Sequence, residues 1–256
     1  MKIINKKEND NMIKVLYYNE KEIINSLAES LVIGGLPMND KVPTSVGLNK
    51  EIEDLKNKLT TIWKHRNLFN FDKTNKIIRL KENSGVTMKD NYCESLDIYF
   101  KRGRTLGNVP VGSGHNSLFK GVQFNMIINF PLYWLKEYQR YHFTDIISSQ
   151  STMHKVLKFN LDDMFGEEVD PRCIEVIKDL KAQYEKESNK DEKKKIWRKI
   201  INSLPDGFTM TQGITMNYLQ LTTMIPQREH HKLSEWSEDL IPFFKELPYY
   251  DFFLID

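Results

Sequence analysis

Residues Gly114–Lys155 read GHNSLFKGVQFNMIINFPLYWLKEYQRYHFTDIISSQSTMHK. The stretch opens with a small-residue loop that carries His115, continues as the apolar run Phe124–Trp134, and ends in a segment rich in hydrogen-bonding side chains. An apolar element that delivers polar side chains is a common way to build a site on a rigid scaffold. A second stretch, Leu204–Trp236, has the same character. The sequence therefore directs attention to these two stretches and to whether they make one site.

Composition sets the broad class of the protein. The chain has 256 residues, 40% of them hydrophobic and 11% aromatic, which is enough to bury a sizeable core and excludes wholesale disorder. Because 37 basic residues stand against 35 acidic ones, the net charge is only +2. Binding to nucleic acid would therefore require a local basic patch. We expect a single domain spanning residues 1–256.

The cysteines and the apolar runs indicate the compartment. Cys93 and Cys173 lie far apart and have no metal-ligand spacing, so the sequence predicts neither a disulfide framework nor a structural zinc site. The chain does not open with a secretory signal pattern, and no apolar run approaches the roughly 20 residues of a membrane span. We expect a cytoplasmic protein without a membrane partner.

The first hundred residues suggest a strand followed by helices. Hydrophobic periodicity predicts a strand at Met12–Tyr18, helices at Glu20–Leu31 and Asn49–His65, and a short strand at Lys76–Leu80 that follows a turn. The segment between the two helices, from Gly34 to Gly47, is rich in turn residues. Residues Tyr92–Phe100 fit either a short helix or a strand, because their apolar positions alternate while their polar residues permit a helix.

The second half of the chain is predicted to be mostly helical. We expect a polar, turn-like segment at Val156–Pro171, followed by a long helical region from Arg172 that is interrupted near Ser188 and ends at Leu204 and Pro205. A polar link at Thr209–Thr215 leads into a helix at Met216–Met224, which Pro226 breaks or kinks. A last helix is expected at Leu233–Phe244. The run KDEKKK at Lys190–Lys195 is typical of a solvated helix face, and we assign it no chemistry. The aromatic tail from Tyr249 to Asp256 is either packed in the core or an edge strand.

The segment Lys101–Ser117, KRGRTLGNVPVGSGHNS, is rich in glycine and cations. It has two interpretations. Backbone N–H groups and arginines in such a loop can wrap an anion. Alternatively it is an ordinary surface loop, because its glycines fit neither G-x-G-x-x-G nor a P-loop.

Two clusters of polar side chains could carry chemistry. The first lies in one short segment and comprises Arg140, His142, Ser148, Ser149, Gln150, Ser151 and His154. The second follows Pro226 and comprises Arg228, His230, His231 and Lys232. Arginine offers a bidentate fork for phosphate or carboxylate, and serine and glutamine offer neutral hydrogen bonds. Two clusters suited to anions fit a small polyanionic ligand such as a nucleotide.

Structural explanations compete with these chemical ones. A serine-rich turn often caps a helix. His230 and His231 are adjacent, so in a helix they point about 100° apart, and we predict no metal site. The serines lack the G-x-S-x-G frame of a hydrolase nucleophile, which argues against Ser/His hydrolysis.

Several short motifs occur in a recognisable order. His115, Ser117 and Phe119 stand in HNSLF, Phe124 and Pro131 in FNMIINFP, Arg140 in RYH, and Gln150–His154 reads QSTMH. Downstream lie Arg198, Leu204, Pro205, Thr209, Thr215, Asn217 and Arg228. This order resembles the flavin-dependent thymidylate synthases, which carry His-x-Ser-x-Phe, an apolar element with a proline, Arg-His-Arg, and Ser-x-Arg-Tyr. The resemblance lies in residues 101–256.

The chain also departs from the family pattern at cationic positions. Tyr141 and His142 occupy the second and third places of the Arg-His-Arg triplet, and Met153 replaces the arginine of Ser-x-Arg. Leu219 stands where the family has an arginine after Asn217. In the family these arginines hold flavin phosphates and the deoxyuridine nucleotide.

The resemblance implies a fold, a reaction and an assembly. The fold would be α/β or α+β, with a mixed sheet flanked by long helices, and the protein a homo-oligomer, a tetramer in the family. As a flavoprotein of nucleotide biosynthesis it would be a methyltransferase that acts on carbon 5 of a dUMP-like pyrimidine deoxynucleotide. The cofactor would be FAD, with folate and NADPH as co-substrates.

The resemblance also implies roles for individual residues. Catalytic roles fall on Ser151 and Arg228; cofactor binding on His115, Ser117, Arg140 and His142; and nucleotide binding on Ser149, Gln150, Ser151 and Arg228. The alternative is a catalytically inactive relative. Such a relative would use the Lys101–Arg104 and Arg228–Lys232 segments to bind nucleic acid, another nucleotide or a partner protein.

Overall fold

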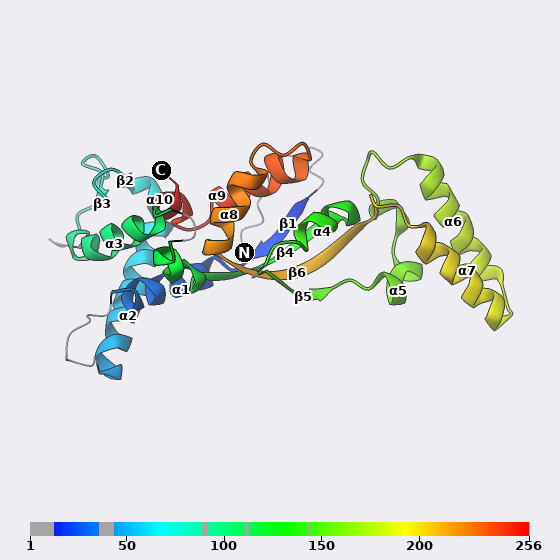
Figure 1. The fold of residues 1–256 in the computed structure, drawn as a ribbon, viewed down its shortest axis with the longest axis horizontal. Helices are drawn as coiled ribbons and strands as arrows, with labels where there is room; N and C mark the ends of the chain where they lie inside the picture. The colour runs from blue at the N-terminus through cyan, green and yellow to red at the C-terminus, as the bar shows by residue number, and fades with distance from the viewer. Residues whose placement is uncertain (1–12, 36–43, 89–91, 111–112, 143, 256) are drawn as a thin grey trace. The chain divides into compact units, whose positions relative to one another are not determined.

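The computed structural model describes residues 13–35, 44–88, 92–110, 113–142 and 144–255 (Figure 1). It has the mixed helix and sheet fold that the sequence predicts, with a four-stranded sheet in the order β1-β4-β6-β5 and a separate β2-β3 hairpin. The chain divides into two compact units. The first unit contains Met1–Tyr18, Met126–Thr215 and Leu233–Glu235, and the second contains the rest. The single-domain expectation stays a prediction.

The secondary structure is as follows. The strands are β1 (Lys14–Tyr18), β2 (Phe69–Asp72), β3 (Ile77–Leu80), β4 (Gln123–Pro131), β5 (Asp145–Ser149) and β6 (Thr209–Asn217). The α-helices are α1 (Glu20–Ile33), α2 (Ser45–Lys64), α3 (Asp97–Gly107), α4 (Leu132–Tyr138), α5 (Thr152–Lys155), α6 (Pro171–Lys186), α7 (Lys190–Ser203), α8 (Tyr218–Arg228), α9 (Ile241–Lys245) and α10 (Tyr250–Leu254). A 3₁₀ helix, η3, spans His115–Lys120, and a π-helix spans Glu235–Leu240.

The apolar run Phe124–Trp134 forms two elements. Its first part lies in β4, where exposed and buried side chains alternate along most of the strand, and β4 pairs antiparallel with β1. After Pro131 the chain turns into α4, whose Trp134 ring lies 4.8 Å from the Phe130 ring and stacks on Tyr138 at 4.8 Å between centroids. The aromatic stack fixes α4 against the buried face of the sheet.

The polar link predicted at Thr209–Thr215 is wrong, because these residues belong to strand β6. The buried side chains Met210, Gln212 and Ile214 alternate with half-buried ones, which is the period of a strand. The polar segment before Gln150 also contains an unpredicted strand, β5, which pairs antiparallel with β6 at the sheet edge. All five residues of β5 are exposed, and its two isoleucines are adjacent, so the strand lacks the alternation of apolar and polar residues that would have marked it.

The long helical region forms the α6–α7 hairpin, with its predicted interruption near Ser188 (Figure 1). Asp170 caps α6 by accepting the Arg172 N–H, and Asn189 caps α7 by accepting two backbone N–H groups. The buried residues of this part form a small core: Val156, Leu161, Ile177 and Ile200. Partly buried apolar side chains from both helices, including Tyr184 and Ile196, complete it.

The second unit contains the hairpin β2-β3 and helices α1, α2, α3 and α8–α10. Helix α2 begins four residues before its predicted start, at Ser45, because Thr44 accepts the Gly47 N–H as its cap. The turn expected before Lys76 joins β3 to β2, a strand that the sequence did not reveal. In the ambiguous stretch Tyr92–Phe100, a turn at Tyr92 and Cys93 leads into a 3₁₀ helix at Glu94–Leu96 and then into α3, so the helical alternative holds from Glu94 onward.

The aromatic tail and the last helices complete the second unit. The tail forms α10, and Phe252 and Phe253 are buried, which confirms the core-packed alternative. Helix α8 continues through Pro226 to Arg228, and the predicted last helix is a π-helix followed by α9. Parts of four predictions lie outside the described residues: Met12 of the first strand, positions 36–43 of the turn-rich segment, positions 111–112 of the glycine-rich loop and Asp256 of the tail. No helix among the described residues is long and apolar enough to cross a membrane.

Candidate functional site

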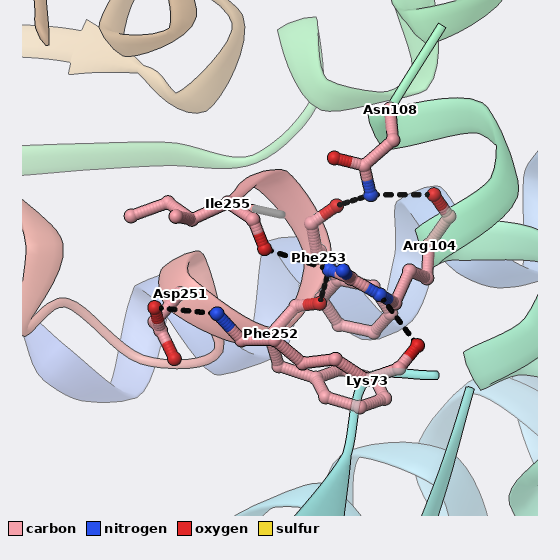
Figure 2. Close-up of polar contacts among 7 residues, drawn as sticks. All are labelled: Lys73, Arg104, Asn108, Asp251, Phe252, Phe253 and Ile255. Carbon is pink, nitrogen blue, oxygen red and sulfur yellow. Dashed lines mark hydrogen bonds and ion pairs between the residues drawn. The ribbon is translucent and has the colours of Figure 1, made fainter. Parts of the chain in front are cut away.

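The anion-wrapping loop predicted at Lys101–Ser117 is contradicted in its first half, because Lys101–Gly107 lies in α3. Arg104 is buried and donates to three backbone carbonyls: Lys73 at 2.9 Å, Phe252 at 2.6 Å and Ile255 at 2.9 Å (Figure 2). Helix C-termini leave carbonyls without intrahelical partners and carry partial negative charge. The guanidinium satisfies these carbonyls around α10 and serves structure.

The glycines of this segment serve the same packing. A Cβ at Gly107 would lie 2.3 Å from the Phe253 carbonyl oxygen, and one at Gly103 would lie 2.6 Å from the Phe253 ring. Glycine thus lets α10 approach α3 closely. Arg102 also donates inward, to the Leu31 carbonyl at 3.1 Å. The described part of α3 therefore explains its arginines and glycines without an anion.

His115 and Ser117 lie in η3 of the second unit, and both are exposed. The Ser117 hydroxyl donates to the Gly114 carbonyl at 2.5 Å, so it offers only lone pairs to a ligand. Phe119, the third residue of the motif, is fully buried and anchors η3. Helix α8 packs against η3, which places His115 and Arg228 on two neighbouring elements.

Arg228 is half-buried at the end of α8, with its Cζ atom 5.0 Å from the centroid of the Trp236 ring. At this distance the guanidinium makes a cation–π contact with the ring. The next residue, Glu229, forms an ion pair with Lys245, whose hydrogen bond lowers the pKa of the Glu229 carboxyl. Among the described residues, no cluster of His, Cys, Asp and Glu side chains has the makings of a metal site.

Arg140 and His142 follow α4 in the first unit, and both side chains are exposed. The Arg140 guanidinium makes no ion pair within the described ranges, so its full donor set faces solvent. An exposed guanidinium of this kind suits a phosphate group. Phe143, which follows His142, lies outside the described residues.

Gln150 and Ser151 follow strand β5, and each uses its side-chain acceptor within the protein. Gln150 Oε1 accepts the Thr211 N–H at 2.9 Å, and Ser151 Oγ accepts the His154 N–H at 3.2 Å as the N-cap of α5. What remains free on these side chains is donor capacity, the Gln150 amide and the Ser151 hydroxyl. Ser149 is exposed on β5 and adds a hydroxyl to these two donor groups. The group therefore suits an acceptor-rich ligand such as a phosphate or a pyrimidine carbonyl.

Strand β5 separates the two sets of residues in the first unit. It spans Asp145–Ser149, which corresponds to roughly 13 Å along the strand. Arg140 and His142 precede its start, whereas Gln150 and Ser151 follow its end. We call residues Ser149–Ser151 the donor station. The two groups of residues therefore do not form a single cluster. They lie at the two ends of an exposed edge strand.

The sequence reasoning missed the partners on neighbouring strands. The backbone N–H of Thr211 donates to Gln150 Oε1, and the Thr211 hydroxyl accepts a hydrogen bond from Asn129 Nδ2 at 3.1 Å. Gln212, opposite Ser149 in the register, is buried, and its Oε1 makes no hydrogen bond within the described residues. A polar residue at a buried position of an alternating stretch, as in TMTQGITMN, was the signal that could have found it.

Of the comparisons with known proteins, the one with solved structures gives matches. No model of a known protein family matches the sequence, and neither does any curated protein. Among solved structures, the chain is similar to the flavin-dependent thymidylate synthase ThyX from Helicobacter pylori complexed with FAD and dUMP, at 12% identity and a TM-score of 0.46, over 95% of this chain and 97% of that one. A second ThyX structure from Helicobacter pylori, also with FAD and dUMP, matches at 12% identity and a TM-score of 0.46, over 95% of this chain and 96% of that one.

Proposed function

We propose that this protein is a divergent flavin-dependent thymidylate synthase-like enzyme that binds a dUMP-like pyrimidine deoxynucleotide and transfers a one-carbon unit to carbon 5. The observation that carries the proposal is the arrangement along β5. An exposed guanidinium and imidazole, Arg140 and His142, precede the strand, and a group of free donors follows it. Phosphates need cations and donors, and a pyrimidine presents carbonyl acceptors.

The order of burial along the motif supports the same proposal. Phe119, Phe124 and Pro131 are buried, as residues that only shape a scaffold should be. His115, Ser117 and Arg140 are exposed, as residues that contact a ligand must be in the free protein. Apolar motif positions therefore build the core, and polar motif positions face solvent.

The residues divide between cofactor and substrate in this proposal. Arg140 and His142 of the first unit bind FAD, and Ser149–Ser151 of the same unit bind the nucleotide. The roles of His115, Ser117 and Arg228, which lie in the second unit, are proposed from the resemblance alone. Ser151 acts catalytically through its free hydroxyl proton. The Arg140 guanidinium fits a flavin phosphate because it is exposed and makes no ion pair among the described residues.

The proposed reaction balances with two co-substrates. Methylene-folate would supply the carbon and leave as tetrahydrofolate, FAD in its reduced form would supply the hydride that completes the methyl group, and the carbon 5 proton would be lost. NADPH then restores the reduced flavin. We further propose a homo-oligomer, a tetramer by the same resemblance, which light scattering after gel filtration would measure.

A second candidate is favoured by one observation. Met153, which is 56% exposed, stands where the family carries an arginine, and a methionine supplies no cation to a ligand there. A non-catalytic relative that binds another nucleotide or a partner protein would tolerate this loss. The α3 arginines no longer support this candidate because they hold the core, so its surface would be Arg228–Lys232.

Thermal melting with ligands tests the proposal. We expect FAD and dUMP each to raise the melting temperature, since a ligand that binds only the folded state stabilises it. Arg140→Gln should reduce the FAD shift and Ser151→Ala the dUMP shift, each measured from the variant's own melting temperature. Arg172→Gln and Ser203→Ala are matched controls on exposed helical positions and should keep both shifts. A dUMP shift without an FAD shift supports the second candidate, and no shift with either ligand overturns the enzyme proposal.

A further inference from the structure

Helix α7 presents a stripe of cations that the proposed function does not use. Lys194, Lys195, Arg198 and Lys199 are all exposed, and together with Asp191 and Asn202 they line an open groove of about 620 Å³. Residues four apart lie one above the other on a helix, about 6 Å along its axis. Lys194 and Arg198 form one such row, and Lys195 and Lys199 form a second.

These cations do not hold the hairpin together. The opposite face of α7 packs against α6, with Ile200 in the small core and Ile196 against it. Trp197 adds a hydrogen bond from its indole N–H to the Met153 carbonyl at 3.1 Å. The apolar face and this bond account for the position of α7, so the basic face is free for another role.

The charge pattern differs from an ordinary solvated helix face. On α6 two cations are paired with carboxylates that precede the helix, Arg172 with the N-cap Asp170 and Lys178 with Asp162. On α7, Lys195 pairs with Glu192 at 2.7 Å, but Lys194, Arg198 and Lys199 form no ion pair among the described residues. Like charges four residues apart destabilise a helix. A bound anion would offset this repulsion between like charges.

We infer that the α7 stripe binds the phosphodiester backbone of a nucleic acid. One strand of a duplex carries a charge about every 3.4 Å, so one turn of α7 faces one to two phosphates. Each of the two rows places two cations about one helical turn apart. This spacing suits a chain of phosphates better than it suits one isolated phosphate group. The contact is with the backbone, so it selects charge and spacing and does not read sequence.

Anisotropy of labelled oligonucleotides, single-stranded and duplex, tests this inference with the full chain. We expect binding to weaken with salt, with a log–log slope near −3 for three phosphates neutralised by the unpaired cations. The triple variant Lys194→Gln, Arg198→Gln, Lys199→Gln should lose most of this slope, about one unit per cation, across all sequences tested. The control Lys21→Gln, Lys50→Gln, Lys64→Gln removes the same charge from exposed positions of α1 and α2 and should keep the slope.

Several results would overturn the inference. One is an equal loss in the stripe variant and the control, because net charge alone would then explain binding. Another is tighter binding to phosphatidylserine vesicles that displaces the oligonucleotide, which would assign the stripe to a lipid surface. Absence of oligonucleotide binding at low salt would also overturn it. Circular dichroism confirms that each variant folds, and none of these readouts depends on FAD or dUMP.

Discussion

Gln150 pairs with Thr211 twice, once through its backbone and once through its side chain. Its N–H donates to the Thr211 carbonyl at 3.0 Å, and its Oε1 accepts the Thr211 N–H at 2.9 Å. The side chain thus replaces a strand carbonyl at the point where β5 ends. This pairing extends the sheet edge by one residue and fixes the chain just before Ser151.

We predict that Gln150→Ala lowers the free energy of unfolding by about 1 kcal/mol or somewhat more, because it leaves the Thr211 N–H without its acceptor. Gln150→Glu keeps a side-chain oxygen in place and should cost clearly less at neutral pH. Urea unfolding measures both. If the two variants lose the same stability, the side-chain bond does not support the sheet edge.

We predict that Arg104→Met destabilises the second unit strongly, by about 3 to 5 kcal/mol, because three carbonyls would lose a buried charged donor. Arg102→Met removes a single bond from a half-buried side chain and should cost about 1 kcal/mol. Chemical denaturation compares the two variants. Equal stability would mean that Arg104 does not anchor α10.

The Glu229–Lys245 pair predicts a pH dependence. Its hydrogen bond lowers the pKa of Glu229 below the ordinary 4.5, so its contribution is present above that value and is lost as the pH falls through the lowered one. Lys245→Met should therefore cost stability at neutral pH and nothing in strong acid. Both side chains are more than a third exposed, so we expect less than about 1 kcal/mol. Stability curves of both proteins against pH measure the difference, and a gap that persists in acid would contradict it.

Met153 predicts a gain of binding. Met153→Arg restores a cation beside the donor station, and a charge-assisted hydrogen bond of about 1.5 to 3 kcal/mol corresponds to roughly tenfold or tighter binding. Calorimetric titration with dUMP and with FAD measures it, and Met153→Gln controls for added polarity without charge. If the two variants bind alike, Met153 does not face a ligand phosphate.

Much of the fold could be predicted from periodicity. The α6–α7 hairpin followed from its apolar spacing and from capping residues such as Asn189, which are local signals. Strands β5 and β6 could not be predicted in the same way. β5 is an exposed edge strand without apolar alternation, and β6 carries polar residues such as Gln212 on its buried face. Such positions are decided by neighbouring strands, which a local pattern does not contain.

The sequence singles out the polar residues of the candidate site, whose roles stay predictions, but it does not give their arrangement. The polarity of Arg140 and Ser151 marked them, yet their separation by β5 required the structure. The α3 arginines were misjudged for the opposite reason. Arg104 has the sequence signature of an anion-binding residue, but its charge is used by backbone carbonyls that come from Lys73 and from α10, far away in the chain. Sequence distance hides such partners.

Retention of FAD through gel filtration, followed by the visible absorbance of oxidised flavin, tests the central claim most directly. We predict that FAD co-elutes with the protein when dUMP is present and that Arg140→Gln releases it, while Arg172→Gln does not. Elution of all FAD as free ligand from the unmodified protein, with dUMP present, would contradict the flavin site proposed at Arg140 and His142.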